Sequence, residues 1–577
     1  MKFRELAIYF QKIENSSSRL TITHLLAELI DKLHINEIDK ALYLMQGRVA
    51  PQFASVEFGL GEKIISRAVL SALHLEKRLF DDHYKKIGDL GDTIEHFKKL
   101  YSSFEEEDLS ISEVYERLLE IAKKSGEKSQ EAKISLLSHL FRQLDPLSCR
   151  YVIRIPLGVL RLGFSDMTVL DAFSWYLKKD KSLRTQIESA YHVRPDLGLL
   201  GKTIKESRDK NLHKIKPAVF TPILMMRAER LSSGAEIIDK IGKCAIEPKY
   251  DGFRLQIHYS KNQTRLYSRN LEDVTHMYPD LVEGIEREIR VDEIIFEGEA
   301  IGFDPYSGSF LPFQETVQRK RKYNIAEKAK EIPLRLFAFD LLYCNGEDYI
   351  NIPFHERRKQ LLKSIKISGD TFKDTLVVTQ EDVVDDPKKI EALFDEAIAR
   401  GLEGIIAKKL DGVYRAGARA SNWIKFKRSY ASKITDTVDC LVMGYDAGKG
   451  KRTAFGIGAF LAGVYDEKKD VFVTVSKIGT GLTDEEWIQL KKRCTKYKSK
   501  TKPALYKVDR TTGVDAWVKP EIIVEIRADE ISRSPVHTAG YALRFPRLEH
   551  FRDDRKPEDA TTLKEIEAMF KSQMSVR

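Results

Sequence analysis

The chain has 577 residues, of which 42% are hydrophobic and 32% charged, and its 96 Lys and Arg against 87 Asp and Glu give a formal net charge of +9. This length excludes a single hydrophobic core and predicts three or four domains of ordinary globular composition. The excess of positive charge is small for so long a chain, so it indicates a polyanionic partner only where the charges cluster.

The five cysteines are widely separated, and the sequence contains no C-x-x-C motif. This excludes a zinc ribbon, argues against a disulfide framework and makes a reducing compartment the expected one. The N-terminal stretch "MKFRELAIYFQKIE" carries acidic residues where a signal peptide needs an uninterrupted apolar core, and no apolar run has membrane-spanning length. We therefore expect a soluble intracellular protein.

The first part of the chain, to about residue 215, has a helical pattern. Residues 110–126 begin with a capping box of Ser110 and Glu113, carry apolar residues at helical spacing and end at Gly126. Residues 134–144 repeat this spacing until Asp145 and Pro146 interrupt it. No repeat of fixed length is found, so a solenoid is not expected.

Two changes of pattern divide the rest of the chain. A basic, proline-bearing segment at 209–222 is typical of a linker, and short alternating strands mixed with helices follow it. Near residue 430 the pattern changes to the strands of a small barrel, with one helical insertion and a closing amphipathic helix. The strands are predicted at 436–448, 458–466, 471–479 and 521–528, and the two helices at 483–494 and 562–573.

A charged strand entrance stands out in the middle region. The stretch "AIEPKYDGFRLQIHY" (245–259) alternates like a strand in its second half, whereas its first half is rich in charge and contains Lys249. A symmetric hairpin with the strand that follows pairs residues whose numbers sum to about 523, which places Arg254 opposite Arg269. Like charges that face each other destabilise a sheet unless an anion lies between them. Two solvated arginines remain the alternative.

Other strands predicted in this region also carry charged or aromatic faces. A single charged pair is typical of the solvent-facing side of an ordinary sheet. The whole set instead indicates a polar pocket that could hold Mg²⁺, phosphates and a base, as phosphoryl transfer requires. The set comprises Glu297 with Glu299, Phe337 with Phe339, Asp340 on the opposite face from these aromatics, Glu403 in an apolar run, and Lys425 with Lys427.

These residues resemble the motifs of a known family. "KYDGFR" (249–254) is similar to the K-x-D-G-x-R motif of covalent nucleotidyltransferases, which include DNA ligases, RNA ligases and mRNA capping enzymes. The segments "SRN" (268–270), "FEGEA" (296–300), "FAFD" (337–340), "LEGIIAKK" (402–409) and "WIKFK" (423–427) follow in family order. Segments 149–174, 194–204, 448–466 and 543–562 resemble further parts of the ATP-dependent DNA ligases of the archaeal and eukaryotic replicative type. The resemblance is therefore nearly end to end.

The resemblance implies a fold and an activity. The expected fold is multidomain α and α+β: an all-helical DNA-binding domain at 1–215, an adenylation domain at 216–430 and an OB-fold β-barrel at 431–577. The implied enzyme is an ATP-dependent DNA ligase that seals nicks through lysyl-AMP, AMP transfer to the 5′-phosphate and attack by the 3′-hydroxyl. It would act as a monomer on nicked double-stranded DNA in replication, repair and recombination, in the cytoplasm at the nucleoid. A sliding clamp is a further expected partner, although no segment is a clear clamp-binding peptide.

The resemblance also implies roles for individual residues in binding ATP. Lys249 would attack the α-phosphate of ATP, and Glu247 would recognise the adenine 6-amino group. The remaining assignments are Arg254 and Glu299 to the ribose, Phe339 to the adenine face, Arg269 to the sugar and phosphates, Lys425 and Lys427 to the α-phosphate, Arg419 to ATP, Arg552 with Asp554 to the leaving pyrophosphate, and Glu297 and Glu403 to Mg²⁺, with Mn²⁺ as a substitute. One departure concerns the last motif, where Arg555 and then Lys556 stand in place of the usual lysine.

DNA contacts and rival functions complete the expectations. Arg150, Arg154 and Arg161 are candidates for sequence-independent phosphate contacts, with ordinary surface arginines as the alternative. An RNA-capping or RNA-joining enzyme is the nearest rival, and the helical N-terminal part argues against it. The absence of a four-cysteine site argues against an NAD-dependent ligase. The full set of pocket residues argues against a catalytically inactive protein that binds DNA ends.

Overall fold

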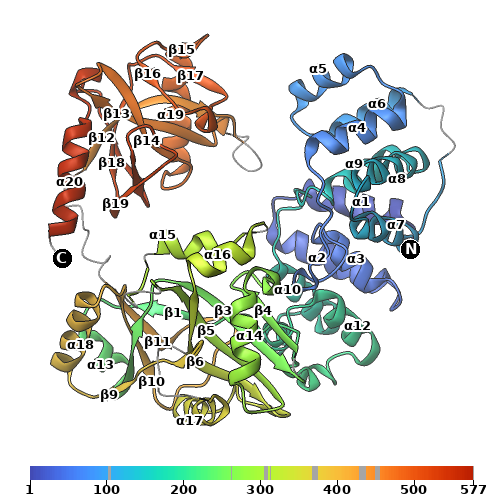
Figure 1. Cartoon of the computed structure of the whole chain (residues 1–577). Coiled ribbons are helices and arrows are strands. Elements are labelled where there is room, and N and C mark those ends of the chain that lie inside the picture. The colour runs from blue at the N-terminus through green and yellow to red at the C-terminus, as the bar shows by residue number, and fades with distance from the viewer. Residues whose placement is uncertain are drawn as a thin grey trace. The chain divides into compact units, whose positions relative to one another are not determined.

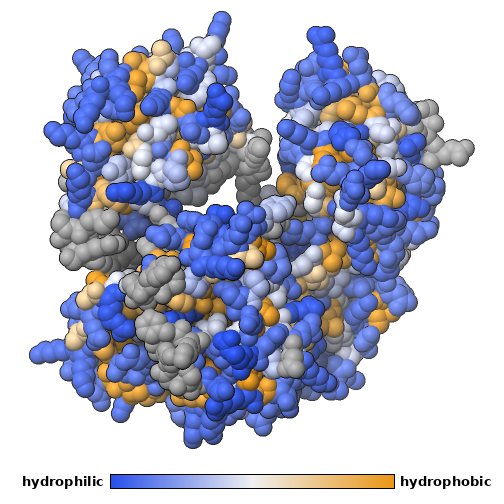
Figure 2. Space-filling model, in the orientation of Figure 1, coloured by the Kyte–Doolittle hydropathy of each residue, from blue (hydrophilic) through white to orange (hydrophobic). Residues whose placement is uncertain are grey.

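The computed structural model describes residues 1–101, 106–261, 263–304, 309–311, 313–321, 323–366, 374–427, 437–448 and 455–575. Within it the chain forms two compact units, Met1–Phe426 and Lys427–Arg577 (Figure 1). The expected boundary at residues 215 and 216 lies inside the first unit, and the one at 430 and 431 lies outside the described residues. The division into three domains at these positions therefore stays a prediction. Hydrophilic residues cover most of the visible face of each unit (Figure 2).

The first unit begins with helices packed around one hydrophobic core. The predicted capping box is present, since the Glu113 amide donates to Ser110 Oγ at 3.2 Å and the Ser110 amide donates to the Glu113 carboxylate at 2.7 Å. Asp145 caps the helix that starts at Pro146, which explains the predicted interruption. The helices are α1 Phe3–Glu14, α2 Arg19–Lys32, α3 Ile38–Met45, α4 Glu62–Leu73, α5 Lys77–Ile87, α6 Leu90–Leu100, α7 Ile111–Lys123, α8 Ser129–Gln143, α9 Pro146–Arg154, α10 Asp166–Lys178, α11 Arg184–Val193 and α12 Leu197–Ser207.

Two sheets follow within the same unit. One has five strands in the order β1-β11-β10-β2-β9, and the other has the order β4-β3-β5-β6-β7, with β8 beside β6. The strands are β1 Arg227–Arg230, β2 Cys244–Lys249, β3 Phe253–Ser260, β4 Gln263–Ser268, β5 Glu293–Gly302, β6 Leu334–Cys344, β7 Glu347–Asp348, β8 Leu376–Val378, β9 Asp382–Val384, β10 Gly404–Lys409 and β11 Arg419–Lys427. The helices are α13 Gly234–Ile241, α14 Pro279–Glu288, α15 Phe313–Thr316, α16 Ile325–Glu331, α17 Phe354–Ser364 and α18 Pro387–Ala399.

The β3–β4 hairpin has the predicted register but a different partner for Arg254. Leu255 pairs with Ser268, so the residue numbers sum to 523, and the ladder between these two strands begins at this pair. Arg254 pairs across the other edge of β3 with Glu299 of β5. Opposite charges thus face each other in the sheet, which is the stabilising arrangement. At the entrance, a Cβ on Gly252 would lie 2.2 Å from the Ala300 carbonyl oxygen, so the close approach of β5 requires a glycine.

The second unit is rich in β-structure. Its main sheet has the order β15-β17-β12-β13-β14-β16, with β18 between β12 and β21, and β19 and β20 form a separate pair. The four predicted strands are β12, β13, β14 and β18, and both predicted helices are present. The elements are β12 Val438–Asp446, β13 Ala459–Asp466, β14 Val471–Ile478, α19 Asp484–Lys496, β15 Lys498–Ser499, β16 Tyr506–Lys507, β17 Ala516–Val518, β18 Ile523–Arg527, β19 Glu530–Arg533, β20 Tyr541–Arg544, β21 Arg547–Phe551 and α20 Leu563–Ser575.

Two further expectations concern cysteines and membranes. All five cysteines are buried, and each is a free thiol. Among the described residues, no helix combines the length and the apolar character needed to span a bilayer.

Candidate active site

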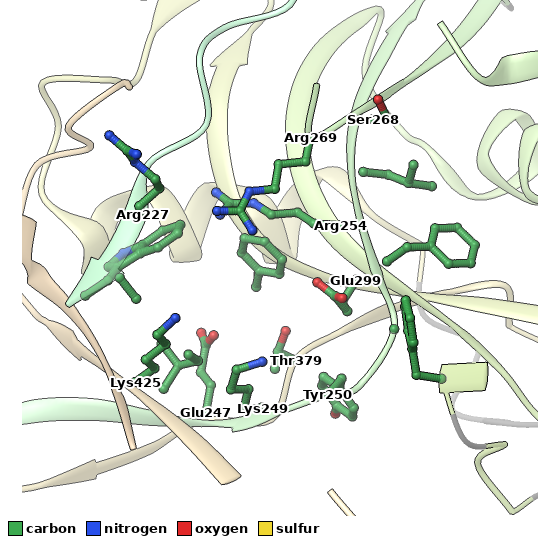
Figure 3. Close-up of a pocket in the computed structure, with 18 of the residues that line it drawn as sticks. Arg227, Glu247, Lys249, Tyr250, Arg254, Ser268, Arg269, Glu299, Thr379 and Lys425 are labelled. Atoms are coloured by element: carbon green, nitrogen blue, oxygen red, sulfur yellow. The ribbon is translucent and has the colours of Figure 1, made fainter. Parts of the chain in front are cut away.

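A cavity of about 470 Å³ lies in the first unit and is lined by both of its sheets (Figure 3). The five-stranded sheet contributes residues of β1, β2, β10 and β11, and the other sheet contributes residues of β3, β4, β5 and β6. Of the sequence-predicted residues, Glu247, Lys249, Arg254, Arg269, Glu299, Phe339, Arg419 and Lys425 line this cavity. Residues far apart in the sequence therefore share one pocket.

Lys249 lies at the end of β2, where the chain turns toward β3. It pairs with Gly404 of β10, and the Glu403 amide donates to its carbonyl oxygen at 3.0 Å. This backbone pairing brings the Glu403 carboxylate into direct contact with Lys249 Nζ. The Lys249 side chain is 21% exposed and extends into the cavity near Glu247 and Lys425 (Figure 3). The predicted nucleophile is thus accessible from the pocket.

Glu299 faces the same space as Lys249. Burial raises the pKa of Glu299 to about 7, while Lys249 and Arg254 counteract this rise, and Glu403 and Asp251 add to it. Glu299 and Lys249 therefore interact electrostatically, and Glu403 is in direct contact with the Lys249 amine. Carboxylate oxygens are the ligands that Mg²⁺ prefers, but among the described residues no group of three or more acidic, histidine or cysteine side chains has metal-binding geometry, so the divalent ion stays a prediction.

Glu297 has a different environment, although it lies on the same strand as Glu299. It is fully buried and does not line the cavity. Its carboxylate accepts hydrogen bonds from Arg254 Nη2 at 2.6 Å, Tyr414 Oη at 3.0 Å and Gln256 Nε2 at 3.3 Å. This placement does not support Glu297 as a metal ligand, because its oxygens already serve to hold Arg254.

Arg254 is held by Glu297 and lies next to two aromatic rings. Its Nη1 donates to the Met226 carbonyl oxygen at 2.7 Å, and its guanidinium lies 5.3 Å from the Phe339 ring centre and 5.2 Å from that of Trp423. Arg254 and Arg269 both face the cavity (Figure 3), so the two arginines are not simply solvated. An aromatic wall next to cations suits a base with its sugar and phosphates.

Several lining residues were not predicted from the sequence. Trp423 precedes Lys425 by two residues in β11, so the alternation that identified Lys425 could also have identified Trp423. Lys427 follows on the same face but does not line the cavity. Further additions include Arg227, Lys320, Thr379 and Lys408, which had no sequence signal strong enough to separate them from ordinary strand and loop residues.

Arg552 belongs to the second unit and is held there by carboxylates. Its guanidinium lies 2.8 Å from Asp554, 3.3 Å from Asp439 and 3.7 Å from Glu525. The ion pair between Arg555 and Asp439 is longer than that of Arg552, with Nε 3.9 Å from the carboxylate. The role of Arg552 toward pyrophosphate stays a prediction.

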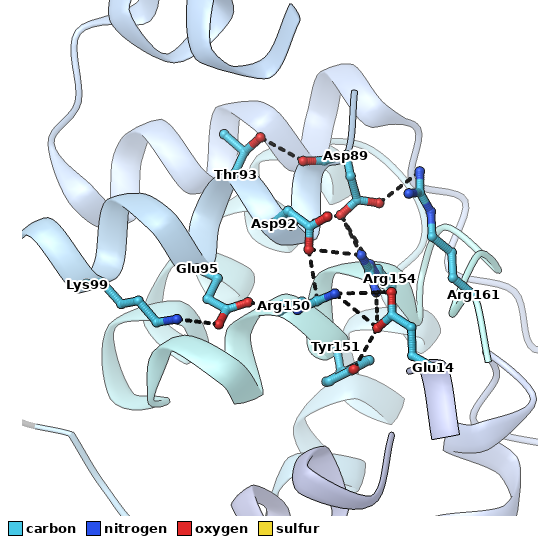
Figure 4. Close-up of polar contacts among 10 residues, drawn as sticks. All are labelled: Glu14, Asp89, Asp92, Thr93, Glu95, Lys99, Arg150, Tyr151, Arg154 and Arg161. Carbon is cyan, nitrogen blue, oxygen red and sulfur yellow. Dashed lines mark hydrogen bonds and ion pairs between the residues drawn. The ribbon is translucent and has the colours of Figure 1, made fainter. Parts of the chain in front are cut away.

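The three arginines predicted to contact DNA belong to a network in the helical part (Figure 4). Arg154 is 1% exposed and forms ion pairs with Glu14, Asp89 and Asp92 at 2.9 to 3.1 Å. Arg150 is 17% exposed and likewise has three carboxylate partners, at 2.9 to 3.2 Å. The burial of Arg154 does not support a phosphate contact, and the carboxylates around Arg150 weaken that prediction too.

Arg161 differs from the other two. Its side chain is 33% exposed, it forms an ion pair with Asp89 at 3.1 Å, and its backbone has a left-handed φ of +60°. A phosphate contact by Arg161 therefore remains a prediction.

A pocket that combines an aromatic wall, several cationic side chains, carboxylates and an accessible lysine fits a nucleotide-dependent transferase. Three family models match the chain: "DNA ligase N terminus" at residues 2–174, "ATP dependent DNA ligase domain" at 225–427 and "ATP dependent DNA ligase C terminal region" at 453–555.

Relatives are similar over the whole chain. A "Probable DNA ligase" of Dictyoglomus turgidum is 48% identical over 99% of this chain and 98% of that protein. "DNA ligase 2" of Thermofilum pendens is 40% identical over 99% of this chain and 98% of that protein. A solved structure titled "Pmar-Lig_PreS3" covers 95% of this chain and 99% of its own, with a TM-score of 0.57 and 17% identity, and so is similar in fold.

The chain therefore belongs to the ATP-dependent DNA ligase family. The predicted fold class, of a helical region, an α+β adenylation region and a β-rich C-terminal region, is confirmed. The predicted enzyme class is also confirmed.

Proposed function

We propose that the cavity of the first unit binds ATP and that Lys249 becomes adenylated there, as the first step of sealing a nick in duplex DNA. The observation that carries this proposal is the position of Lys249, which extends into a cavity lined by cations and aromatic rings and touches the Glu403 carboxylate. A lysine amine must lose a proton before it attacks, because the ammonium form has no free electron pair. Glu403 is in contact with that ammonium and is the proposed acceptor.

The adenylation step forms one bond to phosphorus and breaks another. The Lys249 nitrogen forms a bond to the α-phosphorus, the bond from that phosphorus to the bridging oxygen breaks, and pyrophosphate leaves with the electron pair. Lys425 and Arg269 line the cavity and would stabilise the charge on the phosphates, with Arg419 and Lys427 as further proposed contacts. In the second unit, Arg552 with Asp554 would orient the pyrophosphate.

The adenosine would be held by the remaining groups. Phe339, with Trp423, forms the aromatic wall proposed for the base, and Arg254 and Glu299 lie beside it for the ribose. Glu247, which also lines the cavity, is proposed to accept a hydrogen bond from the adenine 6-amino group. A divalent ion, Mg²⁺ or Mn²⁺, would be held by Glu403 and would neutralise phosphate charge, whereas the oxygens of Glu297 are engaged by Arg254, Tyr414 and Gln256.

The later steps use the same pocket. AMP would pass from Lys249 to the 5′-phosphate at the nick, and the 3′-hydroxyl would then attack that phosphorus and release AMP. The helical part, through groups such as Arg161, would hold the duplex by its phosphates. We further propose that the enzyme works as a monomer in the cytoplasm at the nucleoid, with a sliding clamp as an additional partner.

The test is transfer of label from α-labelled ATP to the protein, followed by denaturing electrophoresis. Wild type should be labelled, Lys249→Ala should not, and Lys243→Ala, an exposed lysine just before β2, should match wild type. Labelling should disappear on chelation of divalent ions and return with Mg²⁺ or Mn²⁺. Equal labelling of Lys249→Ala would refute the proposal, and sealing of nicked DNA compared with RNA ends would separate it from RNA joining.

A further inference from the structure

Glu247 is a buried carboxylate with two cationic partners. It lies on β2, is 2% exposed and lines the cavity. Its Oε2 lies 2.7 Å from Lys408 Nζ, and its Oε1 lies 3.4 Å from Arg358 Nη1. Glu247 pairs with Ile406 of β10, and Lys408 follows two residues later on the same face, so the sheet itself brings the two charges together.

Lys408 is held in place by more than this ion pair. It is 1% exposed, its Nζ donates to the Phe339 carbonyl oxygen at 2.7 Å, and it lies 5.0 Å from the Phe339 ring centre and 4.9 Å from that of Trp423. A buried lysine beside a buried carboxylate stays charged only if the two compensate each other. Lys408 therefore contacts both the Glu247 carboxylate and the aromatic residues of the pocket, and so holds them in a fixed relative position.

Arg358 of α17 is the second cationic partner of Glu247 and contacts its other carboxylate oxygen. Its Nη2 donates to the Thr379 carbonyl oxygen at 2.6 Å, and its Nε lies 2.9 Å from Glu381. The side chain is 12% exposed. Since three groups fix this guanidinium, it can hold Glu247 in one orientation.

We infer that Lys408 and Arg358 are positioning residues that keep Glu247 ionised and aimed at the 6-position of the base, and so make the pocket select a 6-amino purine over a 6-oxo purine. This inference rests on the proposed binding of ATP in the cavity. An ionised carboxylate only accepts hydrogen bonds, which suits a 6-amino donor and repels a 6-oxo acceptor. A protonated carboxyl can donate, so loss of ionisation would remove the discrimination.

The charges that face Glu247 come from several elements. Burial raises the pKa of Glu247, Lys408 of β10 and Arg358 of α17 counteract this rise, and Glu381, which follows β8, adds to it. Tyr250, at the turn after β2, is a further titratable neighbour. Removal of Lys408 would leave the buried carboxylate without its closest cation and would favour its protonated form. Discrimination should then weaken further as the pH falls.

The experiment compares ATP with ITP, which differ only at the 6-position and the adjacent ring nitrogen. Initial rates of protein labelling from the two α-labelled nucleotides are measured between about pH 6 and about pH 8.5. Lys408→Met should lower the ATP-to-ITP ratio about tenfold to hundredfold, and Arg358→Met, with its longer contact, about threefold to tenfold. Lys409→Met and Lys359→Met, exposed neighbours of each, serve as matched controls and should keep the wild-type ratio.

Further readouts separate positioning from a merely structural role. A structural defect lowers the rates with ATP and ITP equally, whereas the inference requires a changed ratio that depends on pH in Lys408→Met. Glu247→Gln, which can both donate and accept, should give a low ratio that is independent of pH. If Lys408→Met does not fold, as judged by thermal unfolding, Arg358→Met decides. Wild-type ratios in every folded cation variant would overturn the inference, whereas a wild type that takes no label from ATP would overturn the proposed function instead.

Discussion

The pocket around Lys249 and the network around Arg154 are both clusters of basic and acidic side chains, but they differ in how accessible their central cation is. Lys249 is 21% exposed and lies among cations and aromatic rings that leave space for a ligand. Arg154 is 1% exposed, and carboxylates from α1, α6 and the residue before α6 surround it (Figure 4). Clustered charge in the sequence thus indicates either a binding site or a structural ion-pair network. The burial of the side chains distinguishes the two.

The sharpest test of this contrast is Lys249→Arg. The variant keeps a positive charge next to Glu403, so the fold should remain and thermal unfolding should match wild type within about 0.5 kcal/mol. A guanidinium is not deprotonated in proteins and cannot attack phosphorus, so labelling from α-labelled ATP should fall by at least about 1,000-fold. A labelled Lys249→Arg would mean that the nucleophile lies elsewhere.

Arg154→Met should show the opposite behaviour. The change leaves Glu14, Asp89 and Asp92 with one cation fewer in a buried site, which should lower the free energy of unfolding by about 3 to 5 kcal/mol. Labelling at Lys249 per folded molecule should be unchanged at a temperature where the variant is folded. Urea denaturation measures the first effect. A loss below about 1 kcal/mol, the size expected of a surface pair, would show that the network is not a buried structural element.

The loss of stability in Arg154→Met should become smaller at low pH. Burial raises the pKa of Asp89, but Arg154, the Asp92 amide and Arg161 together outweigh burial and bring that pKa below its usual range. The stability that comes from a depressed carboxyl pKa is present above the unfolded pKa and is lost as pH falls through the folded value. The difference in unfolding free energy between wild type and Arg154→Met should therefore be retained from neutral pH to about pH 4 and shrink as the pH falls further, through the depressed folded pKa of Asp89. A constant difference would exclude Asp89 ionisation as its cause.

Local signals in the sequence predicted the elements well, and the pocket in part. The capping box at Ser110, the break at Asp145 and the register of the β3–β4 hairpin depend on neighbours in the chain, so they could be deduced. Strand alternation put Glu297 and Glu299 on one face but could not show that Tyr414, over 100 residues later, hydrogen-bonds to Glu297.

Tertiary packing decided the rest. Arg150 and Arg154 lie one helical turn apart, which is typical of a phosphate-binding face, and nothing near them in the sequence reveals Glu14 as their shared partner. Lys408 lies in an apolar run and could be recognised only once β10 paired with β2 and brought it to Glu247. Roles that depend on a distant partner were therefore missed, or remain predictions that the packing does not support.

Substitution of Arg161 has the smallest expected effect on stability. It tests whether this arginine contacts DNA or only extends the ion-pair network around Arg154. Its partner Asp89 retains Arg154 when Arg161 is removed, so Arg161→Met should cost less than about 1 kcal/mol of stability. If the exposed part of this guanidinium contacts a phosphate, affinity for nicked duplex should fall about threefold to tenfold, and the slope of log affinity against log salt should decrease by about 1.

Arg67→Met is the matched control, because Arg67 is an exposed arginine of the same helical part with one carboxylate partner, Glu131 at 2.8 Å. Fluorescence anisotropy with labelled nicked DNA at several salt concentrations measures both quantities. If Arg161→Met and Arg67→Met change affinity and salt slope equally, the phosphate contact is refuted. Arg161 would then be, like Arg154, a side chain whose partner is the protein itself.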